Sequence, residues 1–172
     1  MIQKTLVLIK PDGTEKNLIG EIIRRYEEAG LKVVELKMLQ RAPMSIIERH
    51  YPFDREYLES IGEKTIAAGQ KVKSAYDQGK KVVTWLRKFI TSGPVVAMVL
   101  EGEDAVFLVR NITGFTDPSV AEKGTIRGDL GTDSILKANM EGRPAYNLIH
   151  ASGSPEEAEK EINLWFGDLE IQ

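Results

Sequence analysis

Apolar residues fall along this chain in short runs, and the spacing inside each run predicts its secondary structure. Four compact apolar runs bounded by turn residues predict strands at 4–10, 31–40, 93–102 and 146–152. Between strands, residues 17–30 repeat apolar positions at helical spacing and end in glycine, and residues 103–114 also close on a glycine. We therefore expect a helix after the first strand and another after the third.

Capping signals indicate two further helices. Ser154, Pro155 and Glu157 are the N-cap, the first helical residue and the capping-box partner expected where the last helix begins. Ser45 and Glu48 have the same capping-box spacing, which predicts a short helix that begins at Ser45.

Three segments are less regular. The sequence PDG at 11–13 predicts a turn that ends the first strand. Residues 52–91 favour helices without clear boundaries, and residues 115–146 are expected to be mostly long loop because Pro, Gly, Thr and Asp are frequent there.

The order of these elements contains two split βαβ halves. This order predicts an α+β fold of the ferredoxin-like sandwich type, with a four-stranded antiparallel sheet, in a single domain that spans 1–172. Because this fold hosts many functions, the function has to be argued from particular residues.

The composition excludes several classes of protein. The net charge of -3 argues against a protein that binds nucleic acid through bulk positive charge. The chain has no cysteine, which excludes disulfides and thiolate metal sites. No apolar run approaches the ~20 residues of a membrane helix, and the N-terminal run is too short for a signal peptide, so we expect a cytoplasmic protein without membrane contact.

Candidate chemistry gathers at the end of the fourth predicted strand. His150 is one of two histidines, and the Ala, Ser and Gly that follow it leave room for an approaching group. A neutral imidazole can attack a phosphorus or carbonyl centre, best when a carboxylate holds one of its ring N–H groups. Glu161 on the following helix can be that carboxylate. The alternative is a core histidine whose hydrogen bonds are satisfied.

Basic residues occupy positions that suit anion binding. Lys10 ends the first strand, and Arg127 lies in the glycine-bracketed sequence GTIRGD at 124–129. A surface lysine, and for Arg110 a solvated helix face, are the alternatives. Because substitutions in loops usually change stability little, loss of Arg127 is expected to reduce turnover more than stability.

Motifs for metals and for other nucleotide-binding folds do not occur in the sequence. His50 and His150 lack zinc-ligand spacing, which predicts no protein metal site. His50 is expected on another helix, out of reach as a second nucleophile. Neither the P-loop nor the dinucleotide fingerprint is present, so a nucleotide would need another architecture.

Taken together, five segments resemble the nucleoside diphosphate kinase family and occur in the family's order. They are LVLIKPDG, NLIGEIIRRYEEAG, SGPVVAMVLEG, GTIRGD, and the stretch from NLIHAS to EINLWF. The resemblance covers nearly the whole chain. It implies a ferredoxin-like fold and transfer of the γ-phosphoryl group of ATP or another nucleoside triphosphate to a nucleoside diphosphate, in a ping-pong reaction through phosphorylated His150.

The resemblance also implies residue roles. Glu161 and Ser152 would orient the nucleophile. Contacts to the nucleotide would come from Lys10, Arg110, Thr116, Arg127 and Asn147, and Tyr51 would lie beside the lysine and the histidine. The lysine would reach the phosphates and the ribose 3′-hydroxyl, the arginines and the threonine the phosphates, and the asparagine the sugar, while the tyrosine would support the site. Mg²⁺ would be carried by the phosphates instead of a protein cage, and the family implies a homo-oligomer, either hexamer or tetramer.

Three features depart from the family pattern. Gly153 stands where the family usually has Asp, which puts the rigidity of the turn beside the nucleophile in question. Segments 54–89 and 129–146 are expanded. We expect the first to form an enlarged helical lid over the base, which would stack on Tyr57 or lie against Val82 in another alignment. The alternative is that this segment extends an oligomer contact.

A second class of function is a binding module, or a relay of phosphohistidine to another protein. The joint retention of six family residues favours the enzyme, because a degenerate copy would be expected to lose some of them. They are Lys10, Arg110, Arg127, Asn147, His150 and Glu161.

Overall fold

Four strands form one antiparallel sheet in the computed structural model, which describes residues 1–167. The strands are β1 (Ile2–Ile9), β2 (Lys32–Leu39), β3 (Val95–Glu103) and β4 (Ile149–Ala151), and their order across the sheet is β2-β3-β1-β4. Every paired neighbour is antiparallel. This arrangement confirms the predicted ferredoxin-like α+β class.

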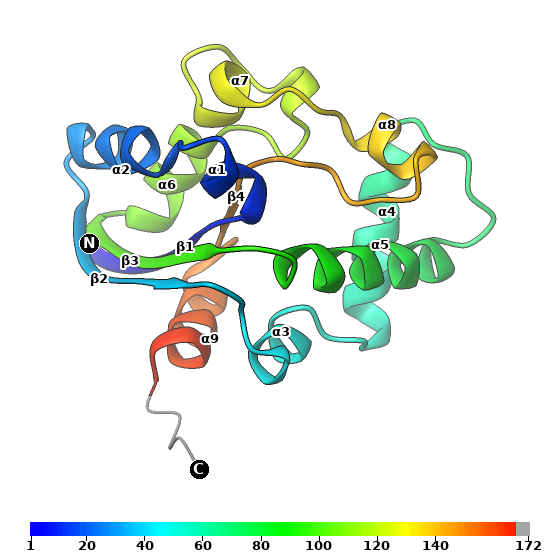
Figure 1. The fold of residues 1–172 in the computed structure, drawn as a ribbon, viewed down its shortest axis with the longest axis horizontal. Helices are drawn as coiled ribbons and strands as arrows, with labels where there is room; N and C mark the ends of the chain where they lie inside the picture. Colours follow the sequence, from blue (N-terminus) through cyan, green and yellow to red (C-terminus); the bar gives the residue numbers. More distant parts are fainter. Residues whose placement is uncertain (168–172) are drawn as a thin grey trace.

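The central strand β1 is buried on both faces because helices cover both sides of the sheet (Figure 1). Leu6 and Leu8 point into one core, and Val7 and Ile9 point into the other, as the two-residue period of a strand requires. His150 pairs with Leu8 in the register of β1 and β4. Its side chain therefore belongs to the same face of the sheet as Leu8.

Each face has its own pair of helices. Helices α2 (Ile19–Glu28) and α6 (Ala105–Thr113) cover the face of Val7 and Ile9, whereas α3 (Met44–His50) and α9 (Pro155–Phe166) cover the face of Leu8. The apolar stripe of α9 ends in Trp165, which is completely buried. The helices that follow a strand in sequence thus close the core through the apolar positions expected from their periodicity.

Helices α4 (Arg55–Ala67) and α5 (Ala75–Ile90) form a pair beside the sheet (Figure 1). They approach each other through glycines, since a Cβ on Gly62 would lie 1.8 Å from the carbonyl oxygen of Ala75. A Cβ on Gly79 would lie equally close to the carbonyl oxygen of Leu58. The expanded segment 54–89 is therefore a packed helical hairpin, in agreement with its apolar content.

The segment expected to be mostly loop contains regular structure, which corrects that expectation. Residues 115–146 hold a 3-10 turn η1 (Pro118–Val120) and two short helices, α7 (Ile126–Leu130) and α8 (Ile135–Met140). Asp117, Thr125 and Ser134 cap these three elements with their side chains. These elements are too short to show a repeating apolar pattern, so only their capping residues could have indicated them in the sequence.

Two other local expectations are wrong. Residues Pro11–Glu15 form the short helix α1 instead of a simple turn. Helix α3 has Pro43 at its N-cap, and no side chain caps it, so Ser45 lies inside the helix. By contrast, Ser154 accepts a hydrogen bond from the Glu157 backbone N–H, as predicted for the start of α9.

Strand β4 is shorter than the predicted 146–152. Leu148 has a φ of 69°, which takes the chain out of extended conformation before β4 begins. Its backbone N–H donates to Asp12 Oδ2 at 2.9 Å, and its carbonyl accepts from the Lys10 N–H at 2.9 Å. These bonds hold the left-handed residue in place and join the end of β1 to the approach to His150.

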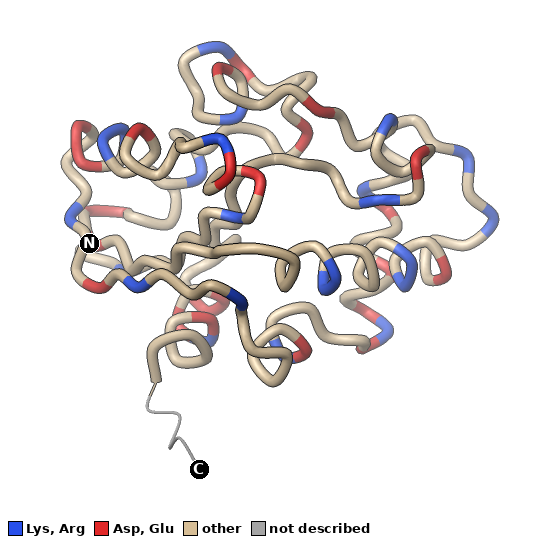
Figure 2. The backbone as a smooth tube through the Cα atoms, in the orientation of Figure 1, with Lys and Arg blue, Asp and Glu red and all other residues tan. Residues whose placement is uncertain are grey.

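Charged residues lie mainly on helices and loops, while the middle of the sheet is largely free of them (Figure 2). Between residues 1 and 167, no helix combines the length and the apolar content needed to cross a bilayer. The assignment of 1–172 to a single domain stays a prediction.

Candidate active site

A cleft between the sheet and the α4–α5 pair brings the candidate residues together. It offers about 420 Å³ to water-sized groups, within the usual range for small-molecule sites. Eight of the ten candidate residues line it, and Ser152 and Glu161 lie behind His150. The eight are Lys10, Tyr51, Tyr57, Arg110, Thr116, Arg127, Asn147 and His150.

His150 is held by a carboxylate on its inner side. Its Nε2 lies 2.8 Å from Glu161 Oε1, and its side chain stays 20% exposed toward the cleft. Ser152 Oγ donates to the other oxygen of Glu161 at 2.6 Å. With Nε2 bound to an ionised carboxylate, Nε2 carries the proton, and Nδ1 keeps the free lone pair.

Glu161 remains ionised although it is buried. Burial alone would raise the pKa of this carboxyl group. The charge and the hydrogen bond of His150, together with the hydrogen bond of Ser152, outweigh burial and bring the pKa to about 2. A fixed anion therefore lies directly behind the imidazole.

His50 lies against His150, which corrects the expectation that it would be out of reach. The ring centroids are 4.4 Å apart at an interplanar angle of 80°. Trp165 Nε1 donates to His50 Nδ1 at 3.2 Å, and burial lowers the pKa of His50 to about 3, with the charge of His150 adding to the effect. The ring is therefore neutral and packs as a rigid wall. His50 and Trp165 were missed because nothing in their local sequence signals the contact.

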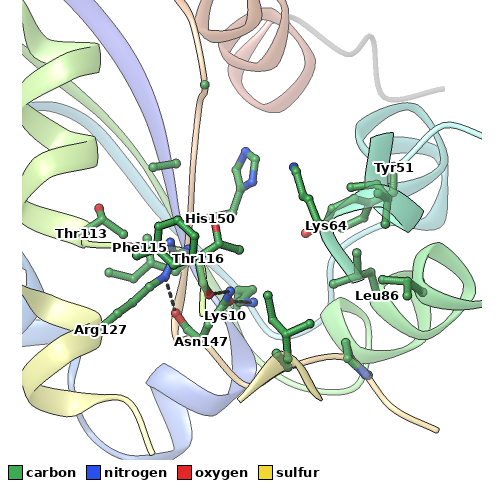
Figure 3. Close-up of a pocket in the computed structure, with 18 of the residues that line it drawn as sticks. Lys10, Tyr51, Lys64, Leu86, Thr113, Phe115, Thr116, Arg127, Asn147 and His150 are labelled. Atoms are coloured by element: carbon green, nitrogen blue, oxygen red, sulfur yellow. Dashed lines mark hydrogen bonds between the residues drawn. The ribbon is translucent and has the colours of Figure 1, made fainter. Parts of the chain in front are cut away.

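Lys10, Asn147 and Thr116 form a connected polar row. Lys10 Nζ donates to Asn147 Oδ1, and Asn147 Nδ2 donates to the Thr116 carbonyl at 2.8 Å (Figure 3). Burial lowers the pKa of Lys10 to about 8; the charge of Asp12 opposes this shift, and that of Arg127 adds to it. The lysine is thus a buried cation at the floor of the cleft and not a surface residue.

Arg127 is built into the fold and is only 8% exposed. Its Nε, Nη1 and Nη2 donate to the carbonyl oxygens of Asn147 at 3.1 Å, Gly114 at 3.0 Å and Ile149 at 2.6 Å. Burial lowers the pKa of the guanidinium to about 10. Because one side chain joins Gly114 to the segment 147–149, the expectation of only a small effect of its loss on stability does not fit this environment.

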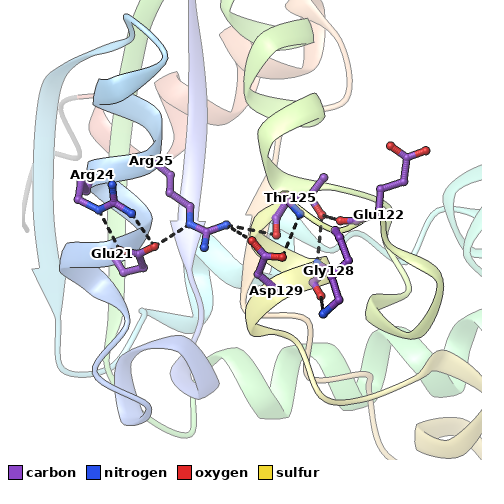
Figure 4. A network of polar contacts seen from close by, with 9 residues as sticks. Glu21, Arg24, Arg25, Glu122, Thr125, Gly128 and Asp129 are labelled. Carbon is purple, nitrogen blue, oxygen red and sulfur yellow. Dashed lines mark hydrogen bonds and ion pairs between the residues drawn. The ribbon is translucent and has the colours of Figure 1, made fainter.

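A polar network ties α7, which carries Arg127, to α2 (Figure 4). Arg25 on α2 donates to Asp129 Oδ2 and to Glu21 Oε1, each at 2.7 Å. Thr125 accepts a hydrogen bond from the first turn of α7 at 3.0 Å. The network restrains the backbone that positions Arg127.

The outer wall of the cleft comes from the α4–α5 pair. Tyr57, Ile61 and Lys64 of α4 face the cleft with Val82 and Leu86 of α5. Tyr57 and Val82, the two alternatives for contact with a base, thus lie on the same wall. Ile61, Lys64 and Leu86 were not singled out from sequence, because the helical phase of this segment was not known.

Two tyrosines of the cleft are shielded from water. Burial raises the pKa of Tyr51 strongly, and burial also raises that of Tyr57, with the charge of Glu157 adding to the effect. Both side chains are therefore neutral phenols. Tyr51 also packs edge-on against His50, with ring centroids 4.6 Å apart.

The turn at Gly153 is held by a carboxylate from α9. The Gly153 backbone N–H donates to Glu157 Oε2 at 2.5 Å. A Cβ on residue 153 would lie 2.5 Å from the same oxygen. In this chain Glu157 thus fixes the turn beside His150, and glycine leaves space for it.

The side chains around the cleft are poorly suited to hold a metal ion. Ligand atoms of His50, His150 and Glu161 lie within 4.8 Å of one another and could surround an ion. However, His50 Nδ1 already accepts the hydrogen bond of Trp165, and His150 Nε2 is bound to Glu161. Among the described residues lining the cleft, Glu157 is the only carboxylate, so the wall offers no oxygen cage of the kind that Mg²⁺ prefers.

Comparison with known proteins gives a consistent match. The family model described as nucleoside diphosphate kinase matches residues 3–60 and 64–171. A nucleoside diphosphate kinase of Pyrobaculum aerophilum is 45% identical over 99% of this chain and 98% of its own length. One from Staphylococcus aureus strain JH9 is also 45% identical, over 99% of this chain and 91% of its own length.

Solved structures agree with these matches. A crystal structure of an NDP kinase from Pyrobaculum aerophilum aligns with a TM-score of 0.90 at 44% identity, over 96% of each chain. A nucleoside-diphosphate kinase of Borrelia burgdorferi, described as a transition state mimic with bound vanadate and ADP, aligns with a TM-score of 0.80 at 36% identity, over 99% of this chain and 90% of that one. The fold and the sequence thus agree over nearly the whole chain, which belongs to the nucleoside diphosphate kinase family.

Proposed function

We propose that this family member transfers the γ-phosphoryl group of a nucleoside triphosphate to a nucleoside diphosphate through a phosphohistidine at His150. The observation that carries the proposal is the 2.8 Å contact between His150 Nε2 and Glu161 Oε1, in a histidine that faces a cleft lined by basic residues. This contact leaves Nδ1 as the nucleophile. A satisfied core histidine would not face such a cleft.

The first half-reaction needs no external base. The Nδ1 lone pair forms the N–P bond while the bond from phosphorus to the bridging oxygen breaks, and the diphosphate leaves with that electron pair. The ring keeps its proton on Nε2, and Glu161 stabilises the positive charge that develops on it. In the second half-reaction, a terminal oxygen of another nucleoside diphosphate attacks the same phosphorus. The N–P bond breaks, and its electron pair returns to His150 Nδ1.

Charge neutralisation comes from the basic side chains around His150. We assign Arg110, Arg127 and Thr116 to the phosphates, and Lys10 to the phosphates and the ribose 3′-hydroxyl. Asn147, already bonded to Lys10 and Thr116, is placed to meet the sugar. Phosphoryl transfer depends mainly on positioning and charge stabilisation, which a preformed cleft of this composition can supply.

Three further parts of the proposal concern supporting residues and the ion. Ser152 orients Glu161, and Tyr51 supports the site through its packing on His50. Mg²⁺ would neutralise charge on the transferring phosphates. It fits this donor set only as an ion bound to the nucleotide itself, since the cleft offers it no protein cage.

A homo-oligomer, hexamer or tetramer, is part of the proposal. Val34, Leu36 and Met38 are exposed by 39%, 50% and 48% at alternate positions of β2, which is an edge strand. Such a row suits contact with a second copy of the chain. Sedimentation velocity tests this part, and fractionation of cells tests the proposed cytoplasmic location.

Labelled ATP tests the reaction itself. Incubation with γ-labelled ATP should give an acid-labile, base-stable phosphoprotein, and added GDP should discharge it as labelled GTP. His150→Ala should remain folded by circular dichroism and carry no label. Label that stays on the protein in the presence of GDP would favour a binding module or a relay to another protein.

A further inference from the structure

We propose that Lys64, on the expanded helical segment, contacts the phosphate chain of the bound nucleotide from the side of the cleft opposite the strands. The inference rests on the proposed function, because it takes nucleoside di- and triphosphates as the ligands of this cleft. It adds a cation that the motifs did not predict.

The position of Lys64 is the first argument. It projects from α4 into the space between α4 and His150 (Figure 3). It lines the same cleft as Lys10, Arg110 and Arg127. Those three residues come from β1, α6 and α7 or their ends, whereas Lys64 approaches from the helical hairpin.

The second argument is which cations are already engaged by protein oxygens. Lys10 bonds to Asn147, and three nitrogens of Arg127 bond to backbone carbonyls. Within residues 1–167, the side chains of Lys64 and Arg110 make no hydrogen bond or ion pair. All side-chain N–H donors of Lys64 and Arg110 are therefore available to an entering anion, whereas Lys10 and Arg127 keep only part of theirs.

Electrostatics agrees with this placement. Partial burial against the cleft wall lowers the pKa of Lys64, Glu157 opposes the shift, and Arg110 and Arg127 lower it further. The ammonium thus lies within the field of two arginines that we assign to phosphates. A polyphosphate between the walls would relieve that repulsion, as charge-assisted bonds to phosphate do.

The expanded hairpin would then do more than cover a base. Its apolar residues Tyr57, Ile61, Val82 and Leu86 suit the base, and Lys64 suits the phosphates. Closure of α4 over the ligand would be favoured by the charge of the substrate, so that adenosine, which has no phosphate, would gain nothing from Lys64.

The test compares Lys64→Met with Lys71→Met as a matched control. Lys71 is an exposed lysine of the same segment, and it does not line the cleft. Calorimetric titration of the full chain with ADP and with adenosine measures the phosphate contribution. Lys64→Met should weaken ADP binding about tenfold, the size of one charged hydrogen bond in a partly exposed site, and leave adenosine binding unchanged. Lys64→Arg should restore most of the affinity. The difference in ADP affinity between wild type and Lys64→Met should shrink at high salt.

Three results would overturn the contact. The first is equal ADP affinity for Lys64→Met and Lys71→Met, and the second is an equal loss of affinity for adenosine and for ADP. The third is a Glu157→Gln variant that reproduces the loss of ADP affinity, since Lys64 would then serve as a partner of Glu157. The readout is binding, so it is separate from turnover. A wild-type protein that binds ADP but never phosphorylates His150 would overturn the proposed reaction alone.

Discussion

Replacing Arg127 by alanine should damage both the fold and the reaction. The guanidinium donates three hydrogen bonds to backbone carbonyls, one on Gly114 and two on the segment that holds Asn147 and Ile149. At about 1 kcal/mol net for each bond, Arg127→Ala should lower the free energy of unfolding by about 3 kcal/mol. Relief of the desolvation that lowers the guanidinium pKa keeps this value from being higher.

The assay pairs stability with turnover on the same preparation. For a chain of this size, about 3 kcal/mol corresponds to a fall in melting temperature of about 6–12 °C. Turnover should fall by about 10²–10³, the usual effect of removing one electrostatic contact to a transferring group. The loss of turnover should appear even at low temperature, where the variant remains folded.

Arg110→Ala is the matched control. Arg110 is exposed, and its side chain has no hydrogen-bond partner within residues 1–167, so its loss should change the free energy of unfolding by no more than about 0.5 kcal/mol while turnover falls. An Arg127→Ala protein that melts within about 2 °C of wild type would refute the argument from the three carbonyls.

Three other predictions follow from the same geometry. Because burial lowers the pKa of Lys10 to about 8, the unliganded enzyme loses this charge as pH rises through 8, and kcat/KM should fall there; a profile that stays flat to about pH 9 would contradict it. Gly153→Asp should destabilise the protein by about 1 kcal/mol in urea unfolding, because Asp would crowd and repel Glu157, and Glu157→Gln should remove most of that penalty. Amide exchange in residues 54–89 should slow when nucleotide saturates the cleft, with Tyr57 among the protected positions; unchanged exchange at saturation would leave the oligomer-contact alternative for this segment.

The expanded segment shows what the local apolar pattern can predict and what it cannot. Apolar residues at helical spacing predicted helices within 54–89, and two helices are there. The spacing is interrupted near Gly69, which lies between the helices, and near Gly79, which lies inside α5, so only the first interruption marks a helix end. The spacing could not show that Gly62 and Gly79 let the two helices touch, nor which of their faces lines the cleft. Those features depend on the packing of one helix against the other, which no periodicity encodes.

Some residues around His150 could likewise be predicted from the local sequence, and others could not. Lys10, His150 and Glu161 could be chosen from strand ends and a following helix, because chemistry-bearing residues at such points recur in α+β folds. His50 was placed out of reach although it touches His150, because the two lie 100 positions apart and meet only when α3 covers the face of the sheet that carries His150.

By itself, the sequence determined the presence of the strands, the long helices and the fold class, since apolar period, glycine ends and the caps of α9 act over a few residues. Tertiary structure alone decided the burial of Arg127, the neutral His50 against His150, and the direction of Lys64. The physical reason is that desolvation and hydrogen bonding depend on which distant segments meet. The sheet order β2-β3-β1-β4 fixes those meetings, and it brings β1, β4, α3 and α9 together around His150.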